Sequence, residues 1–347
     1  MDEQIELDDV AGRRPAVTAP CTLTFGETCG LRQAVLCNGV IRAEILLDKG
    51  ANVRQLWHVA SGTRTLAEAN DWREQLARFR ASELRGSSYC DYYEGGYQDV
   101  LPARAHWEGR ATAEGECVGE AAIVLWEVIR SLATPTAVEV VCRATLRRCG
   151  LHALKRFRLR RGDGSLRIMT TVRNEIGRDV SFSWTQHPAL GGDLLDTNAR
   201  LWLPERQAGI TRHGGDGTGG GNGMGDGNGN ELSSLSCDAG WAPVDTLLPP
   251  PGQPDRFVTF ANARTGEATL ASDARGVAVR LRWDAAIFPH LWLWCARRDA
   301  ITCVTPEPST TYLPELSPRP RPEILRLLRS GESIAARLEM SVFPVRG

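Results

Sequence analysis

The chain has 347 residues, of which 42% are hydrophobic and 24% charged, and 41 basic against 42 acidic residues give a formal net charge of −1. A chain of this length can bury a large core and form one to three domains. No basic excess is available to neutralise phosphates, so a general nucleic-acid partner is not expected. No apolar run approaches the length of a membrane span, so no membrane association is expected either.

The N-terminus and the cysteines both indicate an intracellular protein. The first ten residues, MDEQIELDDV, are acidic and lack the apolar core of a signal peptide. Ten cysteines are spread singly without a CxxC pair, and six histidines form no HxH or HExxH motif. We therefore expect reduced thiols, no metal site, no cofactor and a cytoplasmic location. A secreted protein with disulfides is the alternative.

The first third of the chain contains strand signals followed by a helical one. Residues 1–20 form a polar segment with prolines, which we expect to be a poorly ordered tail before a single domain over 21–347. Asn38-Gly39 separates two apolar runs, which predicts a hairpin of strands 33–37 and 40–47. A third strand is predicted at 52–59. Helical spacing of apolar residues within 65–85 predicts one or two short surface helices.

The segment 89–102, YCDYYEGGYQDVLP, combines aromatic residues with Gly95-Gly96. Paired glycines let the backbone turn sharply or approach a ligand closely. Aromatic faces stack on sugar rings, while the planar polar groups of Gln98 and Asp99 suit sugar hydroxyls. The segment is therefore either part of a sugar site or a group of loops that caps the core.

Strand patterns dominate the remainder of the chain. Alternation of apolar and polar residues predicts strands at 121–130, 137–146, 152–160, 166–174, 200–203, 256–262, 267–272, 277–283, 291–295 and 333–343. The glycine-rich segment 211–230 predicts a flexible insertion between strands and not a domain boundary. Many short strands and few helices predict an all-β sandwich or barrel.

Two residues are candidates for acid–base chemistry. His187 follows an alternating run and precedes Pro188, so we expect it in an extended conformation at a strand end. Imidazole titrates near neutral pH, which suits proton transfer, although a packed structural histidine explains the local pattern equally well. Glu307 lies between Pro306 and Pro308, which predicts a stiff loop that holds the carboxylate in a fixed direction.

Taken in order, the segments from Asn38 to Phe343 resemble the aldose 1-epimerase, or galactose mutarotase-like, superfamily. The segments that carry the resemblance are NGVIRAEILLDKGANVRQLW, GGYQDVLP, GEAAIVLWEV, SFSWTQHPAL, PHLWLWC and TPEPST. The resemblance implies an all-β, galactose mutarotase-like β-supersandwich with few short helices and a carbohydrate cleft on one concave face. It does not fix the substrate, because the same fold also carries lyases, hydrolases and domains without catalysis.

The resemblance also implies roles for individual residues. Glu307 matches the general base of the family and His187 matches its general acid. The substrate-binding residues it suggests are Gln98, Tyr97, Asp99, Trp184, His290 and Arg85. A free glutamate, with a pKa of ~4.3, is ready to accept a proton at pH 7. A free histidine has a pKa of ~6.5, so His187 needs a raised pKa to be mostly charged.

One position departs from the family pattern. The His-Gly-Glu element of the family is Val118-Gly119-Glu120 here, and valine can neither donate a proton nor bind a sugar hydroxyl. Three hypotheses follow, all with a small-molecule carbohydrate as the partner: a mutarotase, a relative with altered chemistry such as isomerisation or elimination, and a carbohydrate-binding protein. His106 or His290 could replace the missing histidine in space. The sequence does not indicate the oligomeric state.

Overall fold

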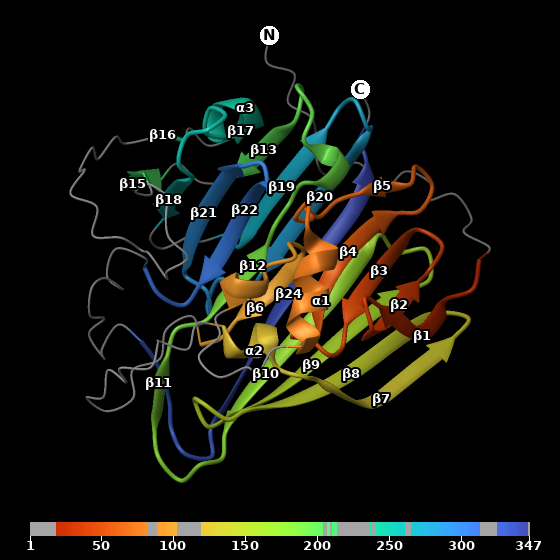
Figure 1. Ribbon diagram of the computed structural model, residues 1–347, viewed down its shortest axis with the longest axis vertical. Helices are drawn as coiled ribbons and strands as arrows, with labels where there is room; N and C mark the ends of the chain where they lie inside the picture. The colour runs from red at the N-terminus through yellow and green to blue at the C-terminus, as the bar shows by residue number, and fades with distance from the viewer. Residues whose placement is uncertain are drawn as a thin grey trace.

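The computed structural model describes residues 19–81, 89–102, 119–203, 207–208, 210–213, 236–237, 240–260, 265–312 and 325–345. Within these residues, two large antiparallel sheets lie face to face, and Figure 1 shows them as two layers. We call them the front sheet, of eleven strands, and the back sheet, of nine strands. No helix in this described part of the chain has the length and apolar content needed to cross a membrane.

The front sheet has the strand order β1-β2-β3-β4-β6-β12-β22-β21-β18-β15, with β5 beside β4. Its strands are β1 (Thr22–Thr28), β2 (Leu31–Cys37), β3 (Ile41–Leu46), β4 (Asn52–His58), β5 (Thr63–Arg64), β6 (Tyr97–Val100), β12 (Thr185–Pro188), β15 (Ile210–His213), β18 (Arg256–Phe260), β21 (His290–Arg297) and β22 (Thr302–Ser309).

The back sheet has the order β17-β13-β19-β20-β24-β10-β9-β8-β7. Its strands are β7 (Glu127–Thr134), β8 (Ala137–Leu146), β9 (Leu151–Arg160), β10 (Ser165–Asn174), β13 (Arg200–Leu203), β17 (Gly240–Pro243), β19 (Glu267–Ser272), β20 (Val277–Trp283) and β24 (Ser333–Pro344). The remaining elements are the strand pairs β11 (Val180–Phe182) with β23 (Arg326–Leu328) and β14 (Gln207–Ala208) with β16 (Ser236–Cys237), and the helices α1 (Trp72–Ala81), η1 (Tyr89–Tyr92), α2 (Glu120–Ile123), η2 (Gly192–Leu194) and α3 (Val244–Leu247).

The hydrophobic core lies between the two sheets because each strand turns its alternate apolar residues inward. In β9, Leu151, Phe157 and Leu159 are fully buried, whereas Leu154 and Arg160 on the other face are exposed. Complete burial of one large apolar side chain contributes about 1.5–3 kcal/mol. The same alternation leaves each sheet one outer face, on which a site can form.

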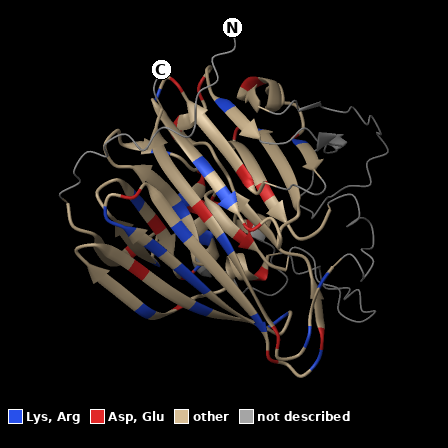
Figure 2. Ribbon diagram, turned by 180° about the vertical axis from the view of Figure 1, so that it is seen from behind, with Lys and Arg blue, Asp and Glu red and all other residues tan. Residues whose placement is uncertain are grey.

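Lys, Arg, Asp and Glu positions are spread along the strands of the back sheet, as Figure 2 shows from behind. Glu139 accepts hydrogen bonds from Arg130 and Arg156 at 2.5 and 2.7 Å, and Glu267 accepts one from Arg282 at 2.7 Å. The arginines of these pairs are largely solvated, although Glu139 itself is only 4% exposed, and pairs with a solvated partner contribute little to stability. On the outer face of the front sheet, by contrast, Gln98 and Glu307 are both buried.

The all-β architecture and most of the predicted strands are confirmed. The hairpin predicted at Asn38-Gly39 joins β2 and β3, and the Asn38 amide also donates to the Arg160 and Asp163 carbonyls, both at 2.6 Å, which ties the hairpin to the back sheet. Within the predicted helical region lies α1, whose Leu76 packs with apolar residues of β2 and β3.

Three predictions need correction. The strand predicted at 121–130 begins only at Glu127, because Glu120–Ile123 is the short helix α2; its Glu120 carboxylate accepts the Arg148 and Cys149 amides at 3.0–3.4 Å. The loop predicted around Glu307 is strand β22. Residues 211–213 of the predicted insertion belong to β15, whereas 214–230, like 1–18 of the predicted tail, lie outside the described residues.

Candidate active site

Strands β12 and β22 are neighbours in the front sheet, and they bring His187 and Glu307 together. Thr185 pairs with Ser309, so the antiparallel register sets His187 opposite Glu307. The His187 Nε2–Glu307 Oε1 distance is 3.4 Å, and the two residues are only 3% and 4% exposed. We call them the central pair. His187 lies one residue before the end of β12, as expected for a strand-end histidine.

The central pair belongs to a row of side chains that crosses the outer face of the front sheet. Gln98 of β6 pairs with His187, Trp292 of β21 pairs with Glu307, and Thr259 of β18 pairs with Trp292. All five residues are buried. Gln98 Oε1 and Thr259 Oγ1 have no hydrogen-bond partner among the described residues. Because buried polar atoms are nearly always paired, this row has unused capacity to bind hydroxyl groups.

Three prolines loosen the contact between β12 and β22. The Val304 and Thr310 amides donate to backbone carbonyls on the β12 side, at 3.0 and 2.9 Å, so every second amide of β22 points toward β12. The two positions between them are Pro306 and Pro308, which have no N–H, and the register sets Pro188 opposite Pro306. The ladder therefore lacks the three backbone donors at positions 188, 306 and 308, which lie next to the central pair.

Two aromatic residues enclose His187. The Tyr93 hydroxyl lies 3.5 Å from His187 Nδ1, and the Tyr93 ring meets the imidazole edge-on, with centroids 5.4 Å apart. The Trp294 ring lies 5.5 Å from the imidazole and is fixed by a hydrogen bond from its Nε1 to Asp255 Oδ2 at 2.6 Å. Each ring nitrogen of His187 therefore has a polar neighbour, Tyr93 at Nδ1 and Glu307 at Nε2.

Burial shifts the pKa of each member of the central pair toward its neutral form. It lowers the pKa of His187 to about 4 and raises the pKa of Glu307 well above its ordinary value. The cause is the same for both groups, since removal from water disfavours a charge of either sign. Both shifts favour a carboxylic acid beside a neutral imidazole over an ion pair, whereas the free pKa of glutamate predicts a carboxylate. In the neutral form of the pair, the proton resides on Glu307.

Tyr97, Asp99 and Trp184 lie on the opposite face of the front sheet, in the core. The Tyr97 hydroxyl and Trp184 Nε1 each donate to Asp99 Oδ1 at 3.0 Å. Thr170 Oγ1 donates to Asp99 Oδ2 at 3.0 Å, and the fully buried Lys155 Nζ lies at the same distance from that oxygen. We call these five residues the Asp99 cluster. In this cluster both oxygens of the Asp99 carboxylate have partners within the protein. The structure therefore does not bring Tyr97, Asp99 and Trp184, which were predicted to bind substrate, to the central pair.

The remaining predicted site residues have different positions. His290 begins β21, pairs with Ser309 one row from the central pair, and packs its ring against Tyr312 with centroids 5.8 Å apart. Arg85, Val118 and His106 lie outside the described residues. Tyr93 and Trp294 complete the site, although the sequence did not single them out. Trp294 could have been found from its spacing, because His290, Trp292 and Trp294 are two residues apart and such residues of a strand lie on the same face of the sheet.

Gly95 and Gly96 serve close packing of the backbone. Their φ angles are +88° and +79°, a region that side chains disfavour. A Cβ on Gly95 would lie 2.3 Å from the Ala67 carbonyl oxygen, and one on Gly96 would lie 2.4 Å from that of Val53. The close approach expected here is therefore to the protein's own backbone, and it fixes the start of β6 and hence Gln98.

Comparisons with known proteins agree with this architecture. No family model matches the chain, and no curated protein matches it. A solved galactose mutarotase-like protein from Lactobacillus casei superposes with a TM-score of 0.60 at 18% identity, covering 93% of this chain and 100% of that one. Another, from Clostridium acetobutylicum, has a TM-score of 0.60 at 12% identity, with 94% and 99% covered.

An Escherichia coli K12 protein that is provisionally named an aldose 1-epimerase gives a TM-score of 0.55 at 14% identity, with 94% of this chain and 100% of that chain covered. Identities this low establish the architecture alone. The chain therefore has the galactose mutarotase-like fold.

Proposed function

We propose that this protein is an isomerase of the aldose 1-epimerase type, which interconverts the anomers of a sugar by opening and reclosing its ring. The observation that carries the proposal is the 3.4 Å contact between His187 Nε2 and Glu307 Oε1 on the outer face of the front sheet. The shared fold with mutarotase-like proteins supports it. The reaction needs one acid and one base near the same anomeric centre, sheltered from water, and the buried pair can supply both.

In the proposed reaction, Glu307 removes the proton from the anomeric hydroxyl while His187 delivers a proton to the ring oxygen. The C1–O5 bond breaks and the anomeric carbon becomes an aldehyde. Rotation about C1–C2 exposes the other face of the aldehyde, the C5 hydroxyl attacks it, and both protons return. The pair ends with the proton it began with, so no co-reactant is required.

The proton must move from Glu307 to His187 before this sequence starts, since burial favours the neutral pair. A sugar hydroxyl that donates to Glu307 favours its carboxylate form, and the proton then passes over the 3.4 Å contact to His187 Nε2. Tyr93 orients the imidazole from its Nδ1 side. Gln98 Oε1, which has no partner among the described residues, accepts a hydroxyl of the substrate.

The alternative is a relative that binds a carbohydrate or carries out an isomerisation or elimination on it. Val118, which stands where the family has its first histidine, is the observation in favour of this alternative. The same fold with altered chemistry would retain the cleft and the base but process a different bond.

NMR exchange spectroscopy on a panel of free aldoses, with wild type beside Glu307→Gln, distinguishes the two. The proposal expects anomer exchange that is accelerated by the wild type and not by the variant. Binding of a sugar without accelerated exchange would overturn the epimerase and favour the alternative. Equal acceleration by both proteins would remove Glu307 from the mechanism.

A further inference from the structure

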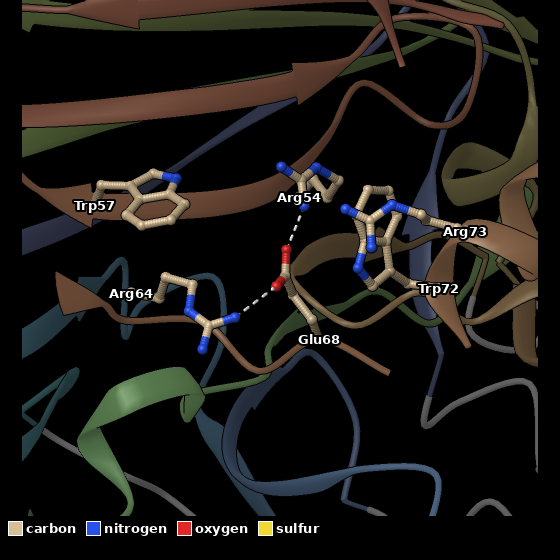
Figure 3. Close-up of a pocket in the computed structure, with 6 residues that line it drawn as sticks. All are labelled: Arg54, Trp57, Arg64, Glu68, Trp72 and Arg73. Carbon is tan, nitrogen blue, oxygen red and sulfur yellow. Dashed lines mark hydrogen bonds and ion pairs between the residues drawn. The ribbon is translucent and has the colours of Figure 1, made fainter. Parts of the chain in front are cut away.

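A polar pocket lies between β4 and the start of α1. It has a volume of about 220 Å³ and is lined by Arg54, Trp57, Arg64, Glu68, Trp72 and Arg73. Figure 3 shows Trp57 and Trp72 on opposite sides of the ion pair between Arg54 and Glu68. Arg64 forms a second ion pair with the Glu68 carboxylate. We call this site the arginine pocket. None of its lining residues belongs to the row that contains the central pair.

The carboxylates around the arginine pocket are shared between cations. Glu68 pairs with both Arg54 and Arg64, and its contact with Arg64 Nη1 measures 3.2 Å. Arg64 also donates to Asp193, with an Nη2–Oδ1 distance of 2.8 Å. Arg54 also pairs with Glu44. Carboxylates thus hold Arg54 and Arg64 in place and orient their guanidinium groups.

Positive charge exceeds negative charge in this network. Arg42 shares Glu44 with Arg54, so the network has four guanidinium groups and three carboxylates when Arg73 is included. Arg73 lies over the Trp72 ring, 4.4 Å from its centroid, and has no carboxylate partner among the described residues. One positive charge is therefore left to attract an anion.

Two buried hydrogen-bond donors of the pocket also lack acceptors. Arg54 is only 9% exposed, and neither its Nε nor Trp57 Nε1 has a partner in the described part of the chain. Burial lowers the pKa of Arg54, and repulsion from Arg73 acts in the same direction. Buried donors without acceptors reduce stability, and an oxyanion relieves both the missing hydrogen bonds and the excess charge.

We propose that the arginine pocket binds the anionic group of a small acidic sugar, a monosaccharide that carries a carboxylate or a phosphate. Arginine suits the planar oxygen pairs of both groups. Trp57 lines the pocket, with Arg42 stacked on its ring at 4.9 Å from the centroid, and a tryptophan ring can also pack against the C–H face of a sugar. The volume is below the range of about 300–1,000 Å³ that is usual for larger ligands, so the ligand is limited to a single small unit.

Isothermal titration calorimetry at low ionic strength tests the proposal with four probes: D-glucuronate, D-glucose 6-phosphate, inorganic phosphate and D-glucose. We expect the acidic sugars to bind at least about tenfold more tightly than D-glucose, and added salt to weaken them. Preference between glucuronate and glucose 6-phosphate identifies the anionic group. Inorganic phosphate bound as tightly as glucose 6-phosphate would overturn the sugar part, and no heat from either acidic sugar would overturn the whole proposal.

Matched variants locate the binding. Arg73 and Arg78 are both exposed arginines of α1, but only Arg73 lines the pocket. We expect Arg73→Gln to weaken the acidic sugar by about tenfold or more, because a charge-assisted contact is lost, and Arg78→Gln to leave it unchanged. Glu307→Gln should also leave it unchanged. If Glu307→Gln abolishes binding while Arg73→Gln does not, the ligand binds at the central pair and the arginine pocket is not its site.

Discussion

Gln98 and Asp99 are adjacent in β6, yet their side chains lie on opposite faces of the front sheet. Gln98 pairs with His187 on the outer face, while Asp99 accepts hydrogen bonds from Tyr97 and Trp184 in the core. The sequence suggested both neighbours as sugar ligands. Because successive side chains of a strand alternate, only one of the two can face the central pair, and their substitutions should have different effects.

Tyr97→Phe and Gln98→Leu form a matched test of this difference. Tyr97→Phe removes a hydrogen bond to a buried carboxylate and should lower the free energy of unfolding by about 1.5–3 kcal/mol, with KM unchanged. Gln98→Leu removes the acceptor Oε1, which has no described partner, and a 3.3 Å hydrogen bond from Nε2 to the Gly95 carbonyl, so it should raise KM at a cost of only about 1 kcal/mol in stability. Urea unfolding and anomer-exchange kinetics measure the two effects. A raised KM in Tyr97→Phe would mean that the core face contacts substrate.

Lys155→Met should be among the most destabilising single substitutions in the chain. Lys155 and Asp99 are both fully buried, with Lys155 Nζ 3.0 Å from Asp99 Oδ2, and loss of one partner leaves the other charge uncompensated. We expect the free energy of unfolding to fall by about 3–5 kcal/mol. The double variant Lys155→Met/Asp99→Asn should recover part of that loss. A double-mutant cycle in urea checks this, and simple additivity would show that the two charges are not coupled.

Substitutions at the central pair should separate catalysis from folding. Glu307→Gln keeps the shape of the side chain and removes the base, so turnover should be abolished with the thermal midpoint nearly unchanged. His187→Asn should lower kcat by about 10²–10⁴, the usual contribution of a positioned proton donor. Glu74→Gln, at an exposed glutamate of α1, is the control and should retain full activity. Wild-type rates in Glu307→Gln would refute the assigned role.

His187 should also make stability depend on pH. Its pKa is lowered from 6.5 to about 4 by burial, so between these values the unfolded chain binds a proton that the folded protein does not. The contribution of His187 to stability is then fully present above pH 6.5 and is lost as the pH drops toward 4, by about 3 kcal/mol in all. The raised pKa of Glu307 acts in the opposite direction over the same range and offsets this loss in wild type. Urea unfolding should therefore show the loss in Glu307→Gln but not in His187→Asn. An equal slope in His187→Asn would assign it to other groups.

The sequence predicted the features that depend on local pattern. Alternation predicted most strands of the back sheet, although not β17 or the start of β7, and helical spacing that includes Leu76 and Phe79 located α1. The local pattern gave a wrong prediction at Glu307, where two flanking prolines indicated a loop and the structure has strand β22. The two prolines nevertheless lie inside β22, where their missing N–H groups leave gaps in the ladder toward β12.

The site itself could be predicted only in part. His187 and Glu307 were identified through family resemblance, not through local pattern. Tyr93 and Trp294 meet His187 from distant strands and loops, and a single sequence does not show which distant segments become neighbours. Whether Asp99 or Gln98 faces the core depends on the register of β6, because a shift of one residue exchanges the two faces of a strand.

The loosened contact between β12 and β22 has a consequence for the order of folding. The side chains of Thr185 and Ser309, which join these strands by a 3.0 Å hydrogen bond, are 124 residues apart in the chain. Closing a loop of that length is slow compared with forming the hairpins of β8, β9 and β10, and here it gains few backbone hydrogen bonds. In refolding, far-UV circular dichroism should therefore recover before activity does. The chemistry of this protein would be the last property it acquires and the first it loses.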